Sequence, residues 1–341
     1  MTINTSTVPD AALSVADSHP VVCHVCASRH LKFLYSVKDS NQDIPGSWRL
    51  LACEGCGLGM LDPMPSLEEI ASFYDDSFYS PDGKRFNRSI EYARSMYARV
   101  RGQTLKFLRP RAGRMLDFGA GAGHFRRAMA EAGWEAFGVD ISSQLTKDSV
   151  PPALRMDGPV PRLAFPDDYF DAVTLWHVIE HMPDPRSTLR ELNRVLRMGG
   201  VLLLSQQNFS SFQARVFGRR WLILDPPRHL FQFAPKSLTM LAEQEGFEHL
   251  RMEHSSLELG PFTILQSLLN LLMGNENYLF RMLKVSSLSS HAGTRARIMG
   301  IISLGLAICL SPIALAAYLI LLAARSGDVF TLYVVKTRDS S

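Results

Sequence analysis

The chain has 341 residues, enough for one or two domains, and 46% of them are hydrophobic, which suffices for a large core. Its 36 basic and 33 acidic residues leave a formal net charge of +3, which does not by itself indicate a nucleic-acid partner. Five cysteines are too few for a disulfide scaffold in a chain of this size.

The first twenty residues are polar and show neither a basic start nor an apolar run. They do not have the pattern of a secretory signal. We expect residues 1–20 to be a disordered tail.

Two Cys-x-x-Cys pairs dominate residues 21–62. Two such pairs can place four thiolates tetrahedrally around one zinc ion. The predicted ligands are Cys23, Cys26, Cys53 and Cys56. We predict a structural zinc ribbon, because four thiolates leave no open position for chemistry and a unit this small needs the metal for stability. Reduced surface thiols or a redox pair are the alternatives, and neither requires two evenly built pairs.

The segment after the ribbon is predicted to be a helical linker. Ser66 with Glu69 forms the capping-box pattern that begins a helix. Further on, Tyr92, Met96 and Val100 recur at helical spacing within an arginine-rich stretch. We interpret this stretch as a solvated helix face, and a phosphate- or membrane-facing patch is the alternative.

A strand, a glycine-rich turn and a helix follow. Met115–Phe118 has the composition of a buried parallel strand, and His124–Ala132 has that of a helix with one apolar face. Between them Gly119, Gly121 and Gly123 occupy every second position. Glycine permits a positive φ and lets a ligand approach without a Cβ in the way. The start of the helix adds free N–H groups and a positive dipole end.

The turn reads Asp-x-Gly-x-Gly-x-Gly, with Asp117 just inside the strand end. A dinucleotide-binding turn requires Gly-x-Gly-x-x-Gly, whose last position is His124 here. The pattern resembles motif I of the class I S-adenosylmethionine-dependent methyltransferases. The resemblance implies a loop that wraps the methionine part of the cofactor, with Asp117 acting mainly through loop and water contacts. For the loop alone, a tight turn in another α/β protein is the alternative.

Two acids after this loop extend the resemblance. Trp134–Asp140 is predicted to be a second strand that ends at the carboxyl edge, where open parallel sheets bind ligands. A carboxylate there can accept hydrogen bonds from both ribose hydroxyls. The resemblance implies that Asp140 binds the ribose. It also implies that Asp157, at the end of a predicted third strand over Ala153–Asp157, binds the adenine amine.

The fourth-strand region, FPDDYFDAVTLWHVIEHMPDP, also resembles that family closely. The buried strand Ala172–Trp176 ends at the crevice, and we include Trp176 among the cofactor-binding residues. The ribbon running into CGLGMLDPMPS resembles a bacterial subgroup of these methyltransferases that carries such a module. The resemblance covers roughly Cys23–Phe247 and the last strand.

Three histidines are candidates for a general base: His177, His181 and His229. Methyl transfer from a sulfonium has a good leaving group, so positioning does most of the work. A base is needed only if the acceptor is a hydroxyl or a protonated amine. His177 comes first because it follows the strand directly into the crevice. The alternatives are packing on Pro183 for His181 and a hydrogen bond to backbone for His229.

The remaining predicted elements are a helix over Arg186–Arg197 closed by Gly199-Gly200, strands over Val201–Leu204, Phe247–Glu253 and Asp328–Lys336, and a helix over Pro235–Glu245. In the family that the chain resembles, the last strand inserts antiparallel beside the sixth. The predicted fold is therefore α/β: a Rossmann-like, seven-stranded, mostly parallel sheet with helices on both faces, plus the ribbon and a C-terminal apolar helical insertion.

Two apolar segments make up this insertion. Leu259–Asn275 is uncharged and mostly apolar, and Ile298–Ala324 is uncharged throughout and long enough to span a bilayer. The flanking arginines are Arg295, Arg297 and Arg325. A single crossing would leave the last strand on the wrong side. We therefore favour a monotopic hairpin, kinked at Pro312, on the cytoplasmic face of the membrane. Two crossings, or an apolar helical pair in a homodimer interface, are the alternatives.

The predicted organisation is a tail (1–20), a zinc ribbon (21–62), a helical linker (63–110), a methyltransferase core (111–256), the apolar insertion (257–327), and the last strand with a tail (328–341). The predicted function is methyl transfer from S-adenosyl-L-methionine to a small-molecule or lipid-linked acceptor of the isoprenoid, quinone or glycan type, with Zn²⁺ as a structural metal.

The glycine spacing disfavours a nicotinamide oxidoreductase. The near-neutral charge disfavours a non-catalytic ribbon that binds nucleic acid, and the Trp-His-Val-Ile sequence at the fourth strand disfavours nucleic-acid methylation.

Overall fold

The computed structural model describes residues 21–74, 86, 88–109, 111–140, 162–254, 260–274, 276–284, 294–324 and 326–340. Within these ranges the larger sheet has six strands in the order β5-β4-β6-β7-β10-β9. They are β4 (Arg114–Phe118), β5 (Glu135–Val139), β6 (Phe170–Trp176), β7 (Leu196–Gln207), β9 (Phe247–Glu253) and β10 (Val329–Lys336). The predicted third strand, Ala153–Asp157, lies outside the described residues, and Asp157 with it.

The directions of the strands confirm a mostly parallel sheet. Strands β5, β4, β6 and β7 pair in parallel. Strand β10 is antiparallel to both β7 and β9, so it alone among the six described strands runs the opposite way. The last strand therefore lies beside the sixth predicted strand, as the family resemblance implied.

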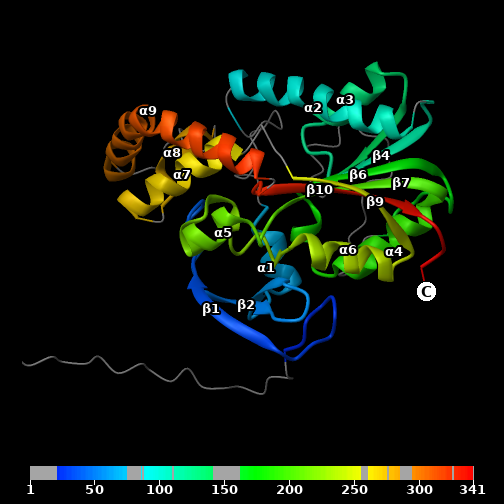
Figure 1. Ribbon diagram of the computed structural model, residues 1–341, viewed down its shortest axis with the longest axis horizontal. Helices are drawn as coiled ribbons and strands as arrows, with labels where there is room; N and C mark the ends of the chain where they lie inside the picture. Colours follow the sequence, from blue (N-terminus) through cyan, green and yellow to red (C-terminus); the bar gives the residue numbers. More distant parts are fainter. Residues whose placement is uncertain are drawn as a thin grey trace, which may run out of the picture.

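Helices cover both faces of this sheet (Figure 1). The helices are α2 (Arg88–Leu108), α3 (His124–Glu131), α4 (Pro185–Val195) and α6 (Pro235–Gln244). Alternate strand residues point to opposite faces: Met115 and Leu203 pack in one core with α2 and α3, whereas Leu116 and Leu202 pack in the other with α4 and α6. Both faces are thus buried, which is why the strands are almost continuously apolar.

One predicted helix end is wrong. Helix α4 ends at Val195, and Gly199 and Gly200 lie inside β7 rather than closing the helix. Leu196 pairs with Phe170 but Val201 pairs with Ala172, so the glycines belong to an irregular stretch of the strand. Gly199 has a φ of 70°, a conformation that suits a strand irregularity as well as a helix end.

The N-terminal module forms a second, antiparallel sheet of β1 (Leu31–Val37), β2 (Trp48–Cys53), β3 (Gly59–Asp62) and β8 (Phe231–Gln232). Strand β8 comes from the core sequence and pairs with β3 through Gly59 with Gln232 and Met60 with Phe231. The predicted capping box is confirmed: Ser66 and Glu69 exchange side-chain-to-backbone hydrogen bonds at the start of α1 (Leu67–Ser72). Short helices α5 (Phe212–Phe217), η2 (Ile179–His181), η3 (Gly218–Arg220) and η4 (Leu222–Leu224) complete the core.

The C-terminal insertion contains α7 (Gly260–Met273), α8 (Tyr278–Leu283) and α9 (Thr294–Ala323). The predicted hairpin within 298–324 is wrong, because α9 is one helix of 30 residues that continues through Pro312. Pro312 has no backbone N–H, so the carbonyl of Ile308, four residues earlier, lacks its usual helical donor. The Ser311 hydroxyl donates to that carbonyl instead, at 2.9 Å.

Helices α7 and α9 pack side by side and antiparallel. A Cβ on Gly260, at the start of α7, would lie 2.3 Å from the ring of Tyr318 near the end of α9. At the opposite ends, the Ser303 hydroxyl lies 3.2 Å from the Met273 sulfur. An 18-residue window within Arg297–Ala323 of α9 has a mean hydropathy of 2.5, and 17% of that window is buried, so by length and composition this helix could cross a membrane.

Candidate functional site

The glycine loop lies at the carboxyl end of β4. Gly119, Gly121 and Gly123 have φ values of 75°, 50° and 72°, all in the left-handed region that favours glycine. A Cβ on Gly119 would lie 2.4 Å from the Val178 side chain, whereas a Cβ on Gly121 would meet nothing within 4 Å. The loop thus packs tightly on one side and leaves open space at Gly121.

Two predicted acids lie at this loop. Asp140, after β5, is buried, and one of its carboxylate oxygens accepts a 2.9 Å hydrogen bond from the Gly121 N–H. Asp117, in β4, is also buried and accepts a 2.9 Å hydrogen bond from the Thr174 hydroxyl. Burial raises the pKa of Asp117 to about 7. The structure therefore brings together the residues predicted to hold the methionine and ribose parts of the cofactor.

Trp176 ends β6 beside the loop. Its ring lies 5.0 Å from that of Phe125, centroid to centroid, and the Arg101 guanidinium lies 4.4 Å from its centroid. The arginine-rich stretch was interpreted as a solvated helix face, and Tyr92, Met96 and Val100 are indeed exposed. Arg101 of the same stretch is instead half-buried against Trp176. Arg101 could have been found from its spacing, since it follows the buried Ala98 by three positions and precedes the buried Leu105 by four.

A buried glutamate lies among the three predicted histidines. The Glu180 side chain has 0% of its surface exposed, and its Oε1 lies 3.8 Å from His177 Nδ1 and 3.9 Å from His229 Nε2. The rings of His181 and His229 meet edge to face with centroids 4.7 Å apart. His177 has a φ of 57°, which is rare for a residue with a side chain and is typical of functional sites.

We name these four residues the Glu180–histidine cluster: His177, Glu180, His181 and His229. Burial shifts the pKa values of three of them. Burial lowers the pKa of His177 to about 3 and that of His229 well below its usual value, and it raises the pKa of Glu180 to about 8. The two histidines are therefore neutral at physiological pH. Glu180 was not among the predicted site residues, although it stands between two of them in the sequence.

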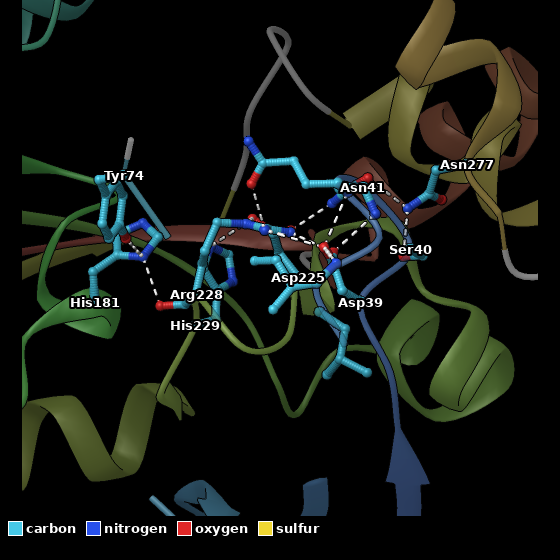
Figure 2. Close-up of polar contacts among 12 residues, drawn as sticks. Asp39, Ser40, Asn41, Tyr74, His181, Asp225, Arg228, His229 and Asn277 are labelled. Atoms are coloured by element: carbon cyan, nitrogen blue, oxygen red, sulfur yellow. Dashed lines mark hydrogen bonds and ion pairs between the residues drawn. The ribbon is translucent and has the colours of Figure 1, made fainter. Parts of the chain in front are cut away.

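Figure 2 shows a polar network that links this cluster to the N-terminal ribbon and to the linker after it. His181 Nδ1 lies 2.9 Å from both the Tyr74 hydroxyl and the backbone carbonyl of Arg228. The buried Arg228 guanidinium forms ion pairs with Asp225 and, at 2.6 Å, with Asp39 of the ribbon. The polar network continues from Asp225 through Asn41 to Asn277. Residues from the ribbon, the core and the insertion thus meet beside the site.

The four predicted zinc ligands converge. One sulfur atom from each of Cys23, Cys26, Cys53 and Cys56 lies within 4.8 Å of every other. The Cys23–Cys56 and Cys26–Cys53 sulfurs are 3.4 and 3.5 Å apart. A disulfide would bring them to about 2 Å, whereas a tetrahedral zinc with Zn–S bonds of about 2.3 Å sets them about 3.8 Å apart. The donor set and its spacing fit a structural zinc ion.

Comparison with known proteins agrees with this geometry. A family model described as a methyltransferase domain matches residues 92–251. The ubiquinone biosynthesis O-methyltransferase of Bordetella avium (strain 197N) is 30% identical over 169 residues, covering 46% of this chain and 69% of that protein. The enzyme of that name from Methylococcus capsulatus (strain ATCC 33009 / NCIMB 11132 / Bath) is 29% identical over 152 residues, covering 40% and 64%.

Solved structures show a weaker likeness. A SAM-dependent methyltransferase from Archaeoglobus fulgidus aligns over 71% of this chain and 94% of its own, with 16% identity and a TM-score of 0.44. The family is shown by the methyltransferase-domain match and by the relative from Bordetella avium, of which this chain covers 69% at 30% identity. The chain belongs to the S-adenosylmethionine-dependent methyltransferases and is a methyltransferase enzyme.

Proposed function

We propose that this methyltransferase acts on a lipid-linked acceptor of the quinone type at the cytoplasmic face of a membrane. The observation that carries the proposal is where the apolar insertion rejoins the sheet. Asp328 lies between α9 and β10. Its backbone carbonyl accepts a 2.7 Å hydrogen bond from the backbone N–H of Asn208, which follows the end of β7. The insertion therefore meets the same sheet edge as the glycine loop, and an acceptor held in lipid would be presented to the cofactor.

The names of the relatives support a quinone-type acceptor. The curated relatives at 29–32% identity are named ubiquinone biosynthesis O-methyltransferases. A quinone precursor with an isoprenoid tail fits an enzyme with a large exposed apolar helix. Small water-soluble acceptors, isoprenoids and lipid-linked glycans are the other acceptor classes that the test below distinguishes.

In this proposal each part of the cofactor has its own partner. The loop of Gly119, Gly121 and Gly123 holds the methionine part, with Asp117 supporting the loop from below. Asp140 accepts hydrogen bonds from the ribose hydroxyls, in addition to the one it already accepts from the Gly121 amide. The aromatic face of Trp176 forms one wall. Asp157 for the adenine amine remains a prediction.

The zinc in this proposal is structural and supports the site indirectly. Strand β8 pairs with β3 of the ribbon. Leu230, the residue before β8, connects the ribbon to the methyltransferase core. Its carbonyl accepts from Leu61 of β3 at 3.1 Å, and its N–H donates to the carbonyl of Glu180 at 2.9 Å. The metal thus stabilises the ribbon, which fixes the loop that carries His229.

Transfer of a labelled methyl group tests the acceptor class. The purified full-length protein is incubated with methyl-labelled S-adenosylmethionine and with either the membrane lipids or the aqueous metabolites of a bacterial extract. We expect label in the organic phase, on a product whose mass increases by one methyl group and which absorbs as a quinone or quinol. Label only in aqueous products would overturn the lipid-linked acceptor, and label on a lipid without a quinone ring would overturn the quinone class.

A further inference from the structure

We propose that Tyr318 and Asp328, where the insertion joins the sheet, bind the hydroxyl groups of the acceptor's aromatic ring. We name Thr263, Tyr318 and Asp328 the junction site. That the natural ligand is the acceptor ring rests on the proposed function, whereas binding of a hydroxylated ring is measured without it.

The carboxylate of Asp328 is buried without a hydrogen bond. The residue is 0% exposed and lies between α9 and β10. Neither oxygen of its side chain has a hydrogen-bond partner among the described residues. Burial raises the pKa of this carboxyl to about 6, and the Thr263 hydroxyl of α7 opposes part of the rise. Buried polar atoms are normally paired, so two unpaired oxygens indicate a place for a donor from outside the chain.

The hydroxyl of Tyr318 is in the same condition. Tyr318 is 3% exposed, and its hydroxyl oxygen has no hydrogen-bond partner within the described part of the chain. Asp328 is close enough to act electrostatically on this hydroxyl. Both side chains lie against Gly260 at the start of α7, where a Cβ would be 2.3 Å from the tyrosine ring and 3.4 Å from Asp328 Oδ1. Two unpaired polar groups from different elements therefore meet at one glycine, where a side chain would collide.

The junction site adjoins the acceptor side of the crevice. Val329, the residue after Asp328, pairs with Gln207 at the end of β7. The side-chain amide of Gln207 lies 3.1 Å from His229 Nδ1, which belongs to the Glu180–histidine cluster. Asp328 is thus one residue along the chain from a direct link to the candidate general bases.

A second set of contacts leads from the junction site to the cofactor wall. Tyr97 of α2 also acts electrostatically on the Tyr318 hydroxyl. The Arg101 guanidinium lies 4.9 Å from the centroid of the Tyr97 ring and 4.4 Å from that of Trp176. A ring held at Tyr318 would therefore lie on the same side of the sheet edge as Trp176.

The unpaired atoms define which ligand the site accepts. Carboxylate oxygens only accept hydrogen bonds, whereas a tyrosine hydroxyl can donate or accept. The ligand must therefore donate, and a ring with two neighbouring hydroxyls can donate to Asp328 while one of its oxygens accepts from Tyr318. Ile264 and Ala314 pack with Tyr318 in an apolar cluster, which favours an aromatic ring over a more polar ligand such as a sugar.

The same atoms favour substrate over product. Methylation replaces a hydroxyl by an ether, which cannot donate a hydrogen bond. A site built to accept that bond rejects a ligand without the donor, because the buried carboxylate oxygen is then left unpaired. The methylated ring should therefore bind more weakly than the hydroxylated one.

Binding of catechol, compared with its dimethyl ether, tests the junction site. Dissociation constants are measured by ligand-observed NMR on the full-length, zinc-loaded protein without a methyl donor, at about pH 8, where Asp328 is ionised. We expect wild type to bind catechol at least about tenfold more tightly than the ether. Asp328→Asn should weaken catechol binding at least about tenfold and leave the ether unchanged, because hydrogen bonds to a charged acceptor are the stronger ones.

Two further variants complete the experiment. Tyr318→Phe removes one oxygen atom and should weaken catechol binding about threefold or more. Tyr333→Phe is the matched control, because Tyr333 is also a buried tyrosine, 2% exposed, and its hydroxyl donates to Glu253 at 3.1 Å, outside the junction site. Its catechol affinity should equal that of wild type.

Two results would overturn the junction site. One is a wild-type protein with no preference for catechol over its ether, and the other is equal catechol affinity in wild type and Asp328→Asn. If Asp328→Asn shows no cooperative thermal unfolding, Tyr318→Phe decides by the same comparison. The catechol preference together with label only in aqueous products would overturn the lipid-linked acceptor and leave the junction site standing. Labelled quinol lipids without the preference would overturn the junction site alone.

Discussion

Gly121 carries the cofactor assignment at the scale of a single residue. Its φ of 50° and the open space above it leave room for a ligand, and its N–H is bound to Asp140. We expect Gly121→Val to weaken S-adenosylmethionine binding at least tenfold, a loss of about 1.4 kcal/mol, because the side chain would fill that space. Asp140→Ala should cause a similar loss by removing the ribose partner. Isothermal titration calorimetry measures both.

Gly133 provides the control for this prediction. It also has a positive φ, of 90°, and a Cβ there would meet nothing within 4 Å, but it lies in the turn between α3 and β5. Gly133→Val therefore imposes a comparable backbone strain away from the cofactor. Its affinity should stay at the wild-type value while its unfolding temperature falls. Equal affinity losses at both glycines would contradict the assignment of the loop.

Asp117 should make the stability of the cofactor-free protein depend on pH. Its pKa is raised by burial from 3.8 to about 7, so the folded state holds a proton that the unfolded state releases. This contribution is fully present below about pH 4 and is lost as the pH rises through about 7. Asp117→Asn cannot ionise, so wild type should lose a few kcal/mol relative to the variant over this range. Urea unfolding at several pH values measures it, and parallel curves for the two proteins would contradict the prediction.

At the scale of elements, locally encoded features were predictable. The helix after the glycine loop begins at His124 as predicted, and β9 spans Phe247–Glu253 as predicted. These elements follow from apolar periodicity and from turn residues beside them in the sequence. The Gly199-Gly200 pair misled the prediction because the same local signal suits a helix end and a strand irregularity, and only pairing with β6 decides between them.

The features of the site that could not be predicted from the sequence depend on contacts between residues far apart in the chain. The glycine loop and Asp140 were found because their spacing is a local pattern. The approach of Arg101 to Trp176, and the pairing of β8 with β3, join residues far apart in the chain. Glu180 was overlooked for a related reason: its burial among three histidines depends on His229, which arrives from a distant loop held by the ribbon. A cluster of this kind has no signature in spacing alone.

At the scale of the whole molecule, the insertion buries polar side chains on α7 and exposes large apolar side chains on α9. The buried polar residues of α7 are Thr263, Gln266, Ser267 and Asn270. Ser267 accepts from the Leu222 amide at 3.1 Å, and Asn270 donates to the Arg220 carbonyl at 3.0 Å. On α9, Ile301, Ile308 and Ile320 are each about 70% exposed. A helix of a water-soluble surface shows the reverse pattern, so this surface requires an apolar partner.

A membrane is the partner we predict, with the exposed Arg295 and Arg297 at its headgroups. In flotation with anionic phospholipid vesicles, the full-length protein should rise with the lipid. Ile308→Lys combined with Ile320→Lys should reduce the floated fraction at least tenfold, because a lysine near the middle of an apolar helix, as at position 308, costs roughly 2.5–3.5 kcal/mol in a bilayer.

Leu250→Lys on β9 is the matched control for this experiment. Leu250 is also an exposed apolar side chain, and it lies on the edge strand of the sheet rather than on the insertion. The control should float like wild type, since the same charge is added outside α9. The homodimer alternative makes a different prediction: wild type stays in the aqueous fraction as a dimer, and the double lysine variant becomes a monomer in analytical ultracentrifugation. That result would assign the apolar face of α9 to a second copy of the chain and would remove the physical basis for a lipid-linked acceptor, since the site would then open to water alone.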